Sequence, residues 1–544
     1  MYRTLLPWLI LVGHSVSLCT SPPIIVPITS VQLSNGNSRR GIFGTVGTPA
    51  QNVSFMVHTY LNDTWIYNAT DSFCDSQTVD QCLTYRGGLL DTEKSTSYSH
   101  EEDVYAAGGD PSDVAQMPVP HIRYNAWATD TLTMGSASLS TFPIGMPGLD
   151  FGGDFDSQAN FGLGQNSTLL QRLKDDGRIA SRSWSYWWGV ENALSRSAMD
   201  GHLILGGYDA AKVVGVPFTQ PLRNASLACR SGMILPISNL LLNFPNGTSS
   251  DLNPSAVLTA CLQPDFPSIM TVPAEPYWWR FQDVTGTQFS NKSLGTNWFV
   301  PVFPSSNVYA GDLEIQIQGG PAINIPNDVL AVPNEYIDES GVVQHNDSAA
   351  DVLFSPIDGN NIDDQLIIGK QFFSGAYLTV NLDNQTWSIW PVKATTDTQL
   401  TTIGESCDDA TNSTTIAQPD DSAESRTGTI SNGVIAGIAV GGSCVVIALV
   451  ILIVFMIRKR KAKRTSATNL AAADFGSRSN DDRVCSDKSQ YFAIRHGTVQ
   501  EMAGSQTVPY ELGSEVKPVE LGHNGWNGRK SSRHHAVELP ATRH

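Results

Sequence analysis

The first side chains able to do chemistry lie at the end of an apolar strand-like run. His58, Thr59 and Tyr60 follow Val53 to Val57, a run with the composition of a β-strand. A histidine can act as a general base, and Asp265, from a distant part of the chain, is a candidate to orient it. The simpler interpretation is that His58 is a tolerated polar residue. Neither Gly-x-Ser-x-Gly nor His-Glu-x-x-His occurs, and no Cys/His spacing indicates a metal, so we expect no cofactor.

The residues around His58 resemble the first active-site segment of the pepsin-like aspartic peptidases. The segment begins Gly47-Thr-Pro-Ala-Gln51, continues as the apolar strand, and ends with a second apolar group around Trp65. The resemblance places His58 where that family has its catalytic aspartate. Thr59 falls on the family's threonine, and Tyr60 falls on the glycine that lets two catalytic loops approach closely.

Four later segments resemble the same family in the expected order, which extends the resemblance over about 350 residues. They are Asp130-Thr-Leu-Thr-Met-Gly135, Phe161-Gly-Leu-Gly164, Gly201-His-Leu-Ile-Leu-Gly-Gly-Tyr-Asp209 and Leu366-Ile-Ile-Gly369. Short strand-like runs broken by Gly, Pro and Asn independently indicate an all-β fold. The resemblance implies a bilobal pepsin-like aspartic protease fold, with an N-terminal β lobe at 30–210 and a C-terminal β lobe at 215–395.

Aspartic proteolysis requires two carboxylates that share one proton, and neither lobe supplies a convincing one. In the first lobe the nearest carboxylate, Asp63, lies five residues beyond His58. In the second lobe, alignment of the segment before Pro273 places the acid at Pro264, or at Asp265 after a one-residue slip. Asp283 is a weaker match because no buried strand precedes it. The family's flap has only a loose counterpart at Tyr105-Ala-Ala-Gly-Gly-Asp110.

The ends of the chain predict a type I single-pass membrane protein of the cell surface. Residues 1–20 have the charged start and apolar core of a signal peptide. Residues 434–457 form an uncharged apolar stretch long enough for a transmembrane helix, and the basic run 458–464 places the following side in the cytoplasm. Residues 400–432 read as a Ser/Thr-rich stalk, and 458–544 as a disordered cytoplasmic tail.

The cysteines and sequons fit an oxidising, glycosylating compartment. The family resemblance suggests a Cys74–Cys82 disulfide in the first lobe; Cys229–Cys261 is the natural second pair, and Cys407 is left over. The glycosylation sequons, none of which follows residue 457, begin at Asn52, Asn62, Asn68, Asn166, Asn224, Asn246, Asn291, Asn346, Asn384 and Asn412. Cys407, or the small-residue face Gly433, Gly437 and Gly441, would join two copies in a dimer.

Charge and composition narrow the function. The chain carries 52 acidic and 34 basic residues, for a net charge of −18, and its basic residues are concentrated after the apolar stretch. An acidic ectodomain is unsuited to nucleic acid. Three hypotheses remain: a pseudoprotease whose cleft binds a peptide or protein partner, an active but divergent aspartic endopeptidase, and an adhesin or receptor that uses the lobes as a scaffold.

Overall fold

The structure is a computed structural model that describes residues 21–404, apart from 71–76, 113–124, 148–156, 192–197, 227–228, 253–256 and 358–364. Several predictions concern residues outside these ranges: the signal peptide, the segment 434–457, the tail, Cys74, Cys407, Asn412 and the three glycines Gly433, Gly437 and Gly441. Within the described ranges, no helix combines the length and apolar character needed to cross a bilayer.

The described chain is mostly β-sheet with few helices, consistent with an all-β bilobal fold. Alternating burial explains the strands. In β1 (Ile24–Gln32), for example, Ile24, Val26 and Ile28 are buried, while Ile25 and Pro27 between them are exposed. A period of two places one face of a strand on the core and the other toward solvent.

The largest sheet has 12 strands and combines strands from the first half of the described chain with strands from its last part, up to Pro391. Its main path runs β11-β25-β24-β8-β9-β1-β2-β3-β7, and β4, β5 and β6 extend from β2. The strands are β2 (Ser38–Val46), β3 (Gln51–His58), β4 (Ser99–Glu101), β5 (Ala126–Met134), β6 (Ala137–Met146), β7 (Ala159–Gly162), β8 (Ser183–Val190), β9 (Met199–Leu205), β11 (Phe218–Pro221), β24 (Ala376–Asn381) and β25 (Thr386–Pro391).

The second half of the chain builds two further sheets. An eight-stranded sheet runs β19-β18-β12-β14-β23-β15-β22, with β13 beside β12, and a four-stranded sheet runs β16-β17-β21-β20. These strands are β12 (Ile234–Asn243), β13 (Ser249–Asp251), β14 (Leu258–Leu262), β15 (Met270–Val272), β16 (Asn291–Lys292), β17 (Pro301–Pro304), β18 (Asp312–Ile317), β19 (Ala322–Ile325), β20 (Ala331–Ile337), β21 (Val343–Val352), β22 (Phe354–Pro356) and β23 (Leu366–Ile368).

The helices are short and lie at the ends of strands. The α-helices are α1 (Val79–Tyr85), α2 (Val104–Ala107), α5 (Thr168–Asp175), α6 (Trp279–Thr285) and α7 (Asn327–Leu330). Single-turn helices occur at η1 (Ala274–Trp278), η2 (Ser305–Asn307) and η4 (Lys370–Ser374). Ser167 caps α5 by accepting a hydrogen bond from the amide of Leu170.

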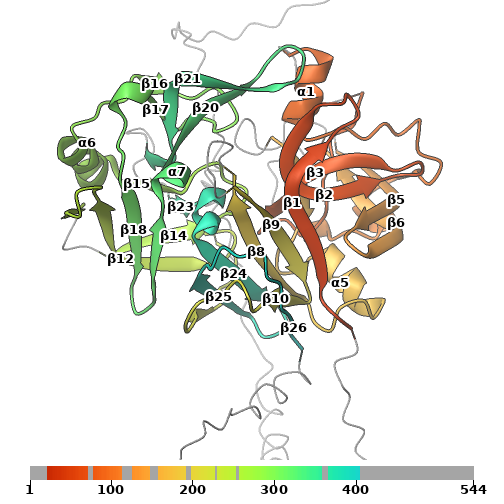
Figure 1. Ribbon diagram of the computed structural model, residues 1–544. Helices are drawn as coiled ribbons and strands as arrows, with labels where there is room; N and C mark the ends of the chain where they lie inside the picture. Colours follow the sequence, from red (N-terminus) through yellow and green to blue (C-terminus); the bar gives the residue numbers. More distant parts are fainter. Residues whose placement is uncertain are drawn as a thin grey trace, which may run out of the picture. The chain divides into compact units, whose positions relative to one another are not determined.

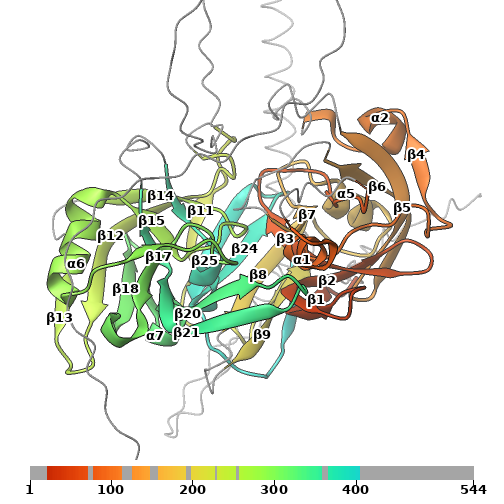
Figure 2. The ribbon, with the colours of Figure 1, turned by 90° about the horizontal axis from the view of Figure 1, so that it is seen from above.

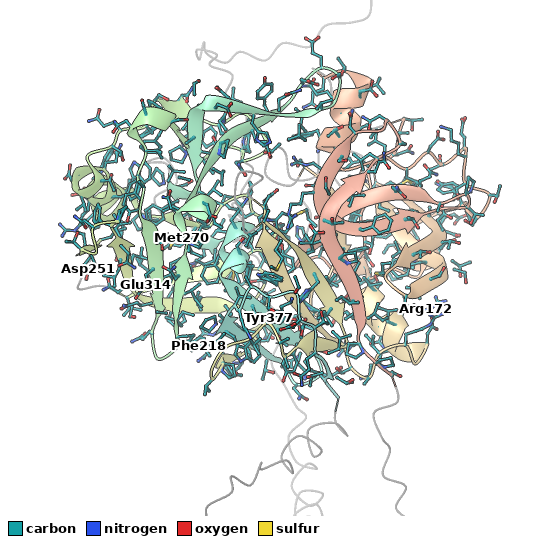
Figure 3. The ribbon with its side chains drawn as sticks, viewed as in Figure 1. Arg172, Phe218, Asp251, Met270, Glu314 and Tyr377 are labelled. Carbon is teal, nitrogen blue, oxygen red and sulfur yellow. A yellow bond between two sulfur atoms is a disulfide. The ribbon has the colours of Figure 1, made fainter. Side chains whose placement is uncertain are left out.

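Antiparallel pairing of β8 with β24 joins the two halves of the chain in one sheet. Tyr186 pairs with Leu378 and Trp184 with Val380, so residues almost 200 apart in sequence share a ladder. Figure 1 shows these strands in the middle of the fold, between the strands of the first half, in red and orange, and those of the second half, in green. Tyr377, labelled in Figure 3, comes from β24, and its hydroxyl oxygen accepts a hydrogen bond from the amide of Asp209 at 2.9 Å.

The hairpin of β20 and β21 reaches from the second half of the chain to α1 in the first half. Figures 1 and 2 both show this hairpin running up to α1. Gln81 of α1 donates a hydrogen bond to the carbonyl of Ile337 at 2.8 Å, and Thr78, the cap of α1, donates to the carbonyl of Glu339 at 2.5 Å. The hairpin therefore ties the two lobes together.

The first residues of the predicted stalk, 400–432, form a strand. Leu400–Thr402 form strand β26, which pairs antiparallel with β10 (Gly207–Asp209). Backbone pairing with β10 makes these three residues part of the fold, because a strand in a ladder has its amide and carbonyl groups satisfied. The boundary predicted at residue 400 therefore falls inside a strand, and the stalk stays a prediction because residues 405–432 lie outside the described ranges.

Candidate active site

Two parallel strand pairs, one in each lobe, position the candidate active-site loops. In the first lobe β3 runs parallel to β7, and His58 pairs with Gly162. In the second lobe β14 runs parallel to β23, and the last pair is Leu262 with Ile368. The two arrangements repeat the same local topology, as two lobes related by a pseudo-two-fold require.

The strand register identifies Gln263 as the second-lobe counterpart of His58. One step beyond the Leu262–Ile368 pair, Gln263 comes opposite Gly369, just as His58 lies opposite Gly162. The loops that follow agree with this register. A Cβ added to Gly162 would lie 2.2 Å from the carbonyl oxygen of Asp63, and one added to Gly369 would lie 2.3 Å from that of Ser268.

The agreement continues to the ends of both loops. Asp63 and Ser268 are each five residues beyond His58 and Gln263. Trp65 forms a parallel bridge to Gly145, and Met270, labelled in Figure 3, pairs in parallel with Phe354. In both lobes the loop packs directly against a glycine, Gly162 or Gly369, and leaves no room for a side chain at that position.

The sequence alignment therefore missed Gln263. It had placed the second-lobe acid position at Pro264, or at Asp265 after a slip, because it relied on Pro273 as an anchor. The register makes Pro264 the counterpart of Thr59 and Asp265 the counterpart of Tyr60. One sequence signal pointed to Gln263: like His58, it is the first polar residue after an apolar strand.

His58 is buried as a neutral imidazole. Its side chain is 1% exposed, and its Nδ1 accepts a hydrogen bond from the amide of Leu61 at 3.2 Å. Burial, with a smaller contribution from the positive charge of Arg230, lowers the pKa of His58 from 6.5 to about 3. A nitrogen that accepts a hydrogen bond cannot carry a proton, which agrees with the lowered pKa.

Tyr60 fills the space that a glycine would leave open. Its ring lies 4.1 Å from the ring of His58, edge to face, and the guanidinium of Arg230 lies 5.2 Å from the Tyr60 ring centroid. Arg230 precedes β12 in the second lobe, so this cation–π contact joins the lobes beside His58. No pattern in the sequence indicated Arg230.

Thr59, which falls on the family's threonine in the resemblance, makes no side-chain hydrogen bond within the described ranges. Its Oγ1 is buried and has no hydrogen-bond partner among the described residues. The counterpart position in the other lobe is Pro264, which has no N–H to donate.

Asp265 is a buried acid with a strongly raised pKa. Burial raises the pKa of Asp265 to about 7. Its Oδ1 is buried without a partner, and its carboxyl forms no hydrogen bond to another carboxyl of the described chain. In a proton-sharing pair, by contrast, the two carboxyl groups lie within hydrogen-bond distance of each other.

The remaining carboxylates of the sequence analysis have other surroundings. Both carboxylate oxygens of Asp63 accept from the amide of Asp110, at 3.0 and 3.1 Å. Asp283 is exposed on helix α6 rather than at the end of a strand. In the flap counterpart, Tyr105 is 72% exposed on α2, and Asn62 anchors the segment by donating to Asp110 at 3.1 Å.

One predicted disulfide is present, and a third cysteine is also disulfide-bonded. Cys229 and Cys261 are bonded to each other, as predicted, which links the Arg230 loop to β14. Cys82 is also disulfide-bonded. Its predicted partner, Cys74, lies outside the described residues, so that pairing stays a prediction.

The sequons differ in accessibility. Asn62 is 4% exposed and its side-chain amide is bonded to Asp110 and Ser112, so a glycan there is incompatible with the folded chain. Asn52 and Asn68 are half-buried. The other described sequons have exposed asparagines, at Asn166, Asn224, Asn246, Asn291, Asn346 and Asn384.

Comparisons with known proteins agree with the fold. The chain is 23% identical over 393 residues to a probable aspartic-type endopeptidase opsB of Aspergillus oryzae, which covers 69% of this chain and 73% of the relative. It is 22% identical over 376 residues to secreted aspartic protease 1 of Candida albicans, covering 66% of this chain and 82% of the relative. No protein-family model matches the chain. The weak similarity supports a pepsin-like aspartic peptidase family.

Proposed function

We propose that this protein is a surface-anchored pepsin-like pseudoprotease, which binds a peptide or protein partner between its lobes without cleaving it. The observation that carries the proposal is the identity of the two equivalent residues at the ends of β3 and β14. They are His58 and Gln263. The relatives are named as endopeptidases, and this chain differs from what that chemistry requires at both positions.

The substitutions remove each component of the mechanism. A general base and a general acid formed from one shared proton require two carboxyl groups in contact. The pKa of His58 is lowered to about 3, so its side chain is neutral at every pH above that value. The amide of Gln263 does not titrate. Tyr60 and Asp265 occupy the positions where the family has small residues, so the loops cannot approach as they do in an active site.

The retained parts of the fold are those that a binding protein needs. The parallel strand pairs, the glycines under both loops and the shared ladder of β8 and β24 hold two lobes in a fixed relation. A rigid scaffold lowers the entropy lost on binding, independently of catalysis. Extracellular placement is supported by the secreted relatives, the oxidised cysteines and the exposed sequons, and anchoring by the apolar segment 434–457 and the basic run after it.

The experiment is a cleavage assay on the purified full chain in detergent. An unfolded protein substrate is incubated between pH 3 and pH 6, with and without pepstatin, beside an active fungal aspartic protease. We expect no pepstatin-sensitive cleavage by this protein. Cleavage that pepstatin abolishes would refute the proposal.

One observation favours an active endopeptidase as the second candidate. Asp265 is buried with a pKa of about 7, and perturbed acids of this kind are common in active sites. If Asp265 were catalytic, Asp265→Asn would abolish pepstatin-sensitive cleavage. The proposal of a pseudoprotease requires instead that wild type and Asp265→Asn give the same background rate.

A further inference from the structure

Arg230 carries unused hydrogen-bond donors at the boundary between the lobes. Its side chain is half-buried, and its guanidinium forms no hydrogen bond or ion pair with a described residue. None of its nitrogens is among the buried side-chain atoms of the described chain that lack a partner, so its N–H groups reach solvent. A guanidinium has five N–H donors in a planar arrangement, and here all of them are available to a ligand.

The ring of Tyr60 holds this guanidinium beside the position where the peptidase family has its first catalytic aspartate. The guanidinium of Arg230 lies 5.2 Å from the Tyr60 ring centroid, and the Tyr60 ring lies 4.1 Å from the ring of His58. A cation held against a ring interacts with the negative face of the ring through electrostatic attraction and keeps its N–H groups for other partners. A second-lobe cation is therefore fixed next to the end of β3.

The backbone on both sides of Arg230 is anchored to the second lobe. Cys229, directly before it, is disulfide-bonded to Cys261 of β14. Ser231, directly after it, is 2% exposed, and its hydroxyl lies 3.3 Å from the sulfur atoms of both cysteines. A side chain presented by a fixed backbone loses less entropy when it binds a ligand than one on a mobile loop.

A contact with the first lobe holds the other end of the same loop. Gln165, from the segment after β7, donates its side-chain amide to the carbonyl of Arg223 at 2.7 Å. The amide of Arg223 in turn donates to the carbonyl of Gly232 at 3.1 Å, which closes the loop that carries Arg230. The loop is thus attached to both lobes, and Arg230 lies between the two attachments in sequence.

The groups at the ends of β3 and β14 leave the positive charge of Arg230 uncompensated. His58 is a neutral imidazole, and Gln263 is an uncharged amide. Burial raises the pKa of Asp265 to about 7, so this acid is mostly protonated at mildly acidic pH, and Arg230 is not among the groups that shift its pKa. In an aspartic peptidase the corresponding acids share one negative charge. The centre of this protein therefore has the opposite sign.

We propose that Arg230 anchors the partner through a carboxylate, so that the peptide segment bound between the lobes is acidic. The inference rests on the proposed peptide-binding function and names the chemistry of its ligand. A guanidinium binds both oxygens of a carboxylate through parallel N–H bonds, whereas a neutral amide side chain offers a single acceptor oxygen. The carboxylate belongs to an Asp or Glu side chain or to a peptide C-terminus, and both present the same group to Arg230.

The test is affinity selection on the immobilised full chain in a non-ionic detergent near pH 5.5, where Asp and Glu side chains are ionised. The probe is a random octapeptide library with acetylated N-termini and amidated C-termini, which carry no terminal charge. Mass spectrometry of the bound fraction gives the ratio of Asp and Glu to Asn and Gln. We expect wild type to enrich the acids about tenfold over the input, and Arg230→Met to show no enrichment. Arg230→Lys, which keeps the charge without the planar donors, should lie between the two.

A thermodynamic cycle then assigns the effect to one pair of groups. The most enriched peptide and its isostere, with Asn for Asp or Gln for Glu, are titrated against wild type and Arg230→Met by fluorescence anisotropy. The isostere should raise the Kd of wild type about tenfold or more, as expected for loss of a charged hydrogen bond, and should leave that of the variant unchanged. Non-reduced peptide mapping of the Cys229–Cys261 bond, with the melting temperature, verifies that the variant is folded.

Arg223→Met is the matched control. It removes the same charge from the same loop, but Arg223 is exposed and contributes only its backbone to the contacts that hold the loop. We expect its enrichment of acids to equal that of wild type. Repeating the selection with free C-termini distinguishes the source of the carboxylate: enrichment of acidic side chains in the amidated library indicates a side chain, and retention of peptides from the free-terminus library alone indicates a C-terminus.

Two results would overturn the proposal. One is binding of peptides by wild type without preference for a carboxylate in either library, and the other is an equal preference in wild type and Arg230→Met. In both cases peptide binding itself would stand, so the failure concerns Arg230 and not the proposed function. Retention of no peptide from either library would overturn this inference together with the binding part of the proposed function, while the absence of cleavage is tested separately.

Discussion

The backbone amide of Leu61 donates a hydrogen bond to Nδ1 of His58 over 3.2 Å. This contact makes Nδ1 an acceptor and places the proton of the neutral ring on Nε2. A protonated His58 would lose the hydrogen bond and place a buried charge near Arg230. His58 lies at the position where the aspartic peptidases have a catalytic aspartate, and its surroundings favour a neutral side chain.

His58 should weaken the fold at acidic pH. The folded-state pKa of about 3 lies below the ordinary 6.5, so between these values the unfolded chain binds a proton that the folded chain does not. Stability is then lost as pH falls from 6.5 toward 3, by up to about 1.4 kcal/mol per pH unit. His58→Gln, which retains an acceptor for Leu61, should remove this component.

Urea unfolding of wild type and His58→Gln at pH 6.5 and pH 4.5 measures the effect. We expect wild type to lose about 2–3 kcal/mol more than the variant over this interval. His202, whose pKa is lowered by burial to about 4, is present in both proteins and cancels in the comparison. Equal losses in the two proteins would show that the folded chain protonates His58 as readily as the unfolded chain does, which would contradict the lowered pKa.

Asp265 should have the opposite dependence on pH. Its folded-state pKa of about 7 lies above the ordinary 3.8, so between these values the folded chain binds the extra proton. Stability is fully present at acidic pH and falls as pH rises toward 7. Because an amide does not titrate, and each unit of pKa shift is worth about 1.4 kcal/mol, Asp265→Asn should be about 4 kcal/mol more stable than wild type at pH 8 and similar to it at pH 4. Urea unfolding at both pH values would reveal an error in this assignment if the difference were independent of pH.

Features that depend on residues close together in the sequence could be predicted from it. Strand runs such as Val53 to Val57 and the Cys229–Cys261 pair follow from composition and spacing, and the structure has both. The second-lobe acid position did not follow, because it is set by pairing between β14 and β23, whose residues are about 100 apart in sequence. An anchor shifted by one residue was enough to hide Gln263.

Features that depend on several distant segments left no sequence signal. Arg40 and Lys370 both contact the ring of Trp188 only because the shared sheet brings both lobes together, and each residue alone is unremarkable in type. The equivalence of Thr59 and Pro264, more than 200 residues apart, likewise follows only from the strand register of the two lobes. The fold was therefore accessible from periodicity and motifs, whereas the electrostatics between the lobes required the structure.

A second buried acid, Asp351, should make the stability of the second lobe sensitive to neighbouring amides. Its carboxylate accepts from Asn334 at 2.7 Å, Asn297 at 3.2 Å and Ser293 at 3.4 Å. Burial raises its pKa to about 7, and these donors oppose that shift by stabilising the charged form. The Asn334 bond is therefore stronger above pH 7 than below it.

Asn334→Ala should destabilise the protein by about 1–3 kcal/mol at pH 8 and by less at pH 5. The measurement is urea unfolding at the two pH values. Asn239→Ala is a suitable control, because Asn239 donates to Asp251 at 2.9 Å, an acid without this buried polar cluster. A larger loss at pH 5 than at pH 8 would contradict the assignment of Asp351 as the group responsible.

The tip of the β20–β21 hairpin should depend on Gly341. This residue has φ of +79°, and an added Cβ would lie 2.5 Å from the carbonyl oxygen of Asp80 in α1. Gly341→Ala must therefore displace the tip, where Asn37 donates to the carbonyl of Ser340 at 2.8 Å. We expect a loss of about 2–3 kcal/mol, from the left-handed backbone and the steric conflict together.

Gly319→Ala separates the two causes, because Gly319 has φ of +72° but nothing within 4 Å of an added Cβ. This control should cost only about 1–2 kcal/mol, the backbone component. Amide hydrogen exchange then locates the effect: in Gly341→Ala, exchange should accelerate in residues 331–352 and in α1, since the tip and the helix share hydrogen bonds. If the two variants exchanged alike in these segments, the hairpin would not be held to the first lobe through its tip.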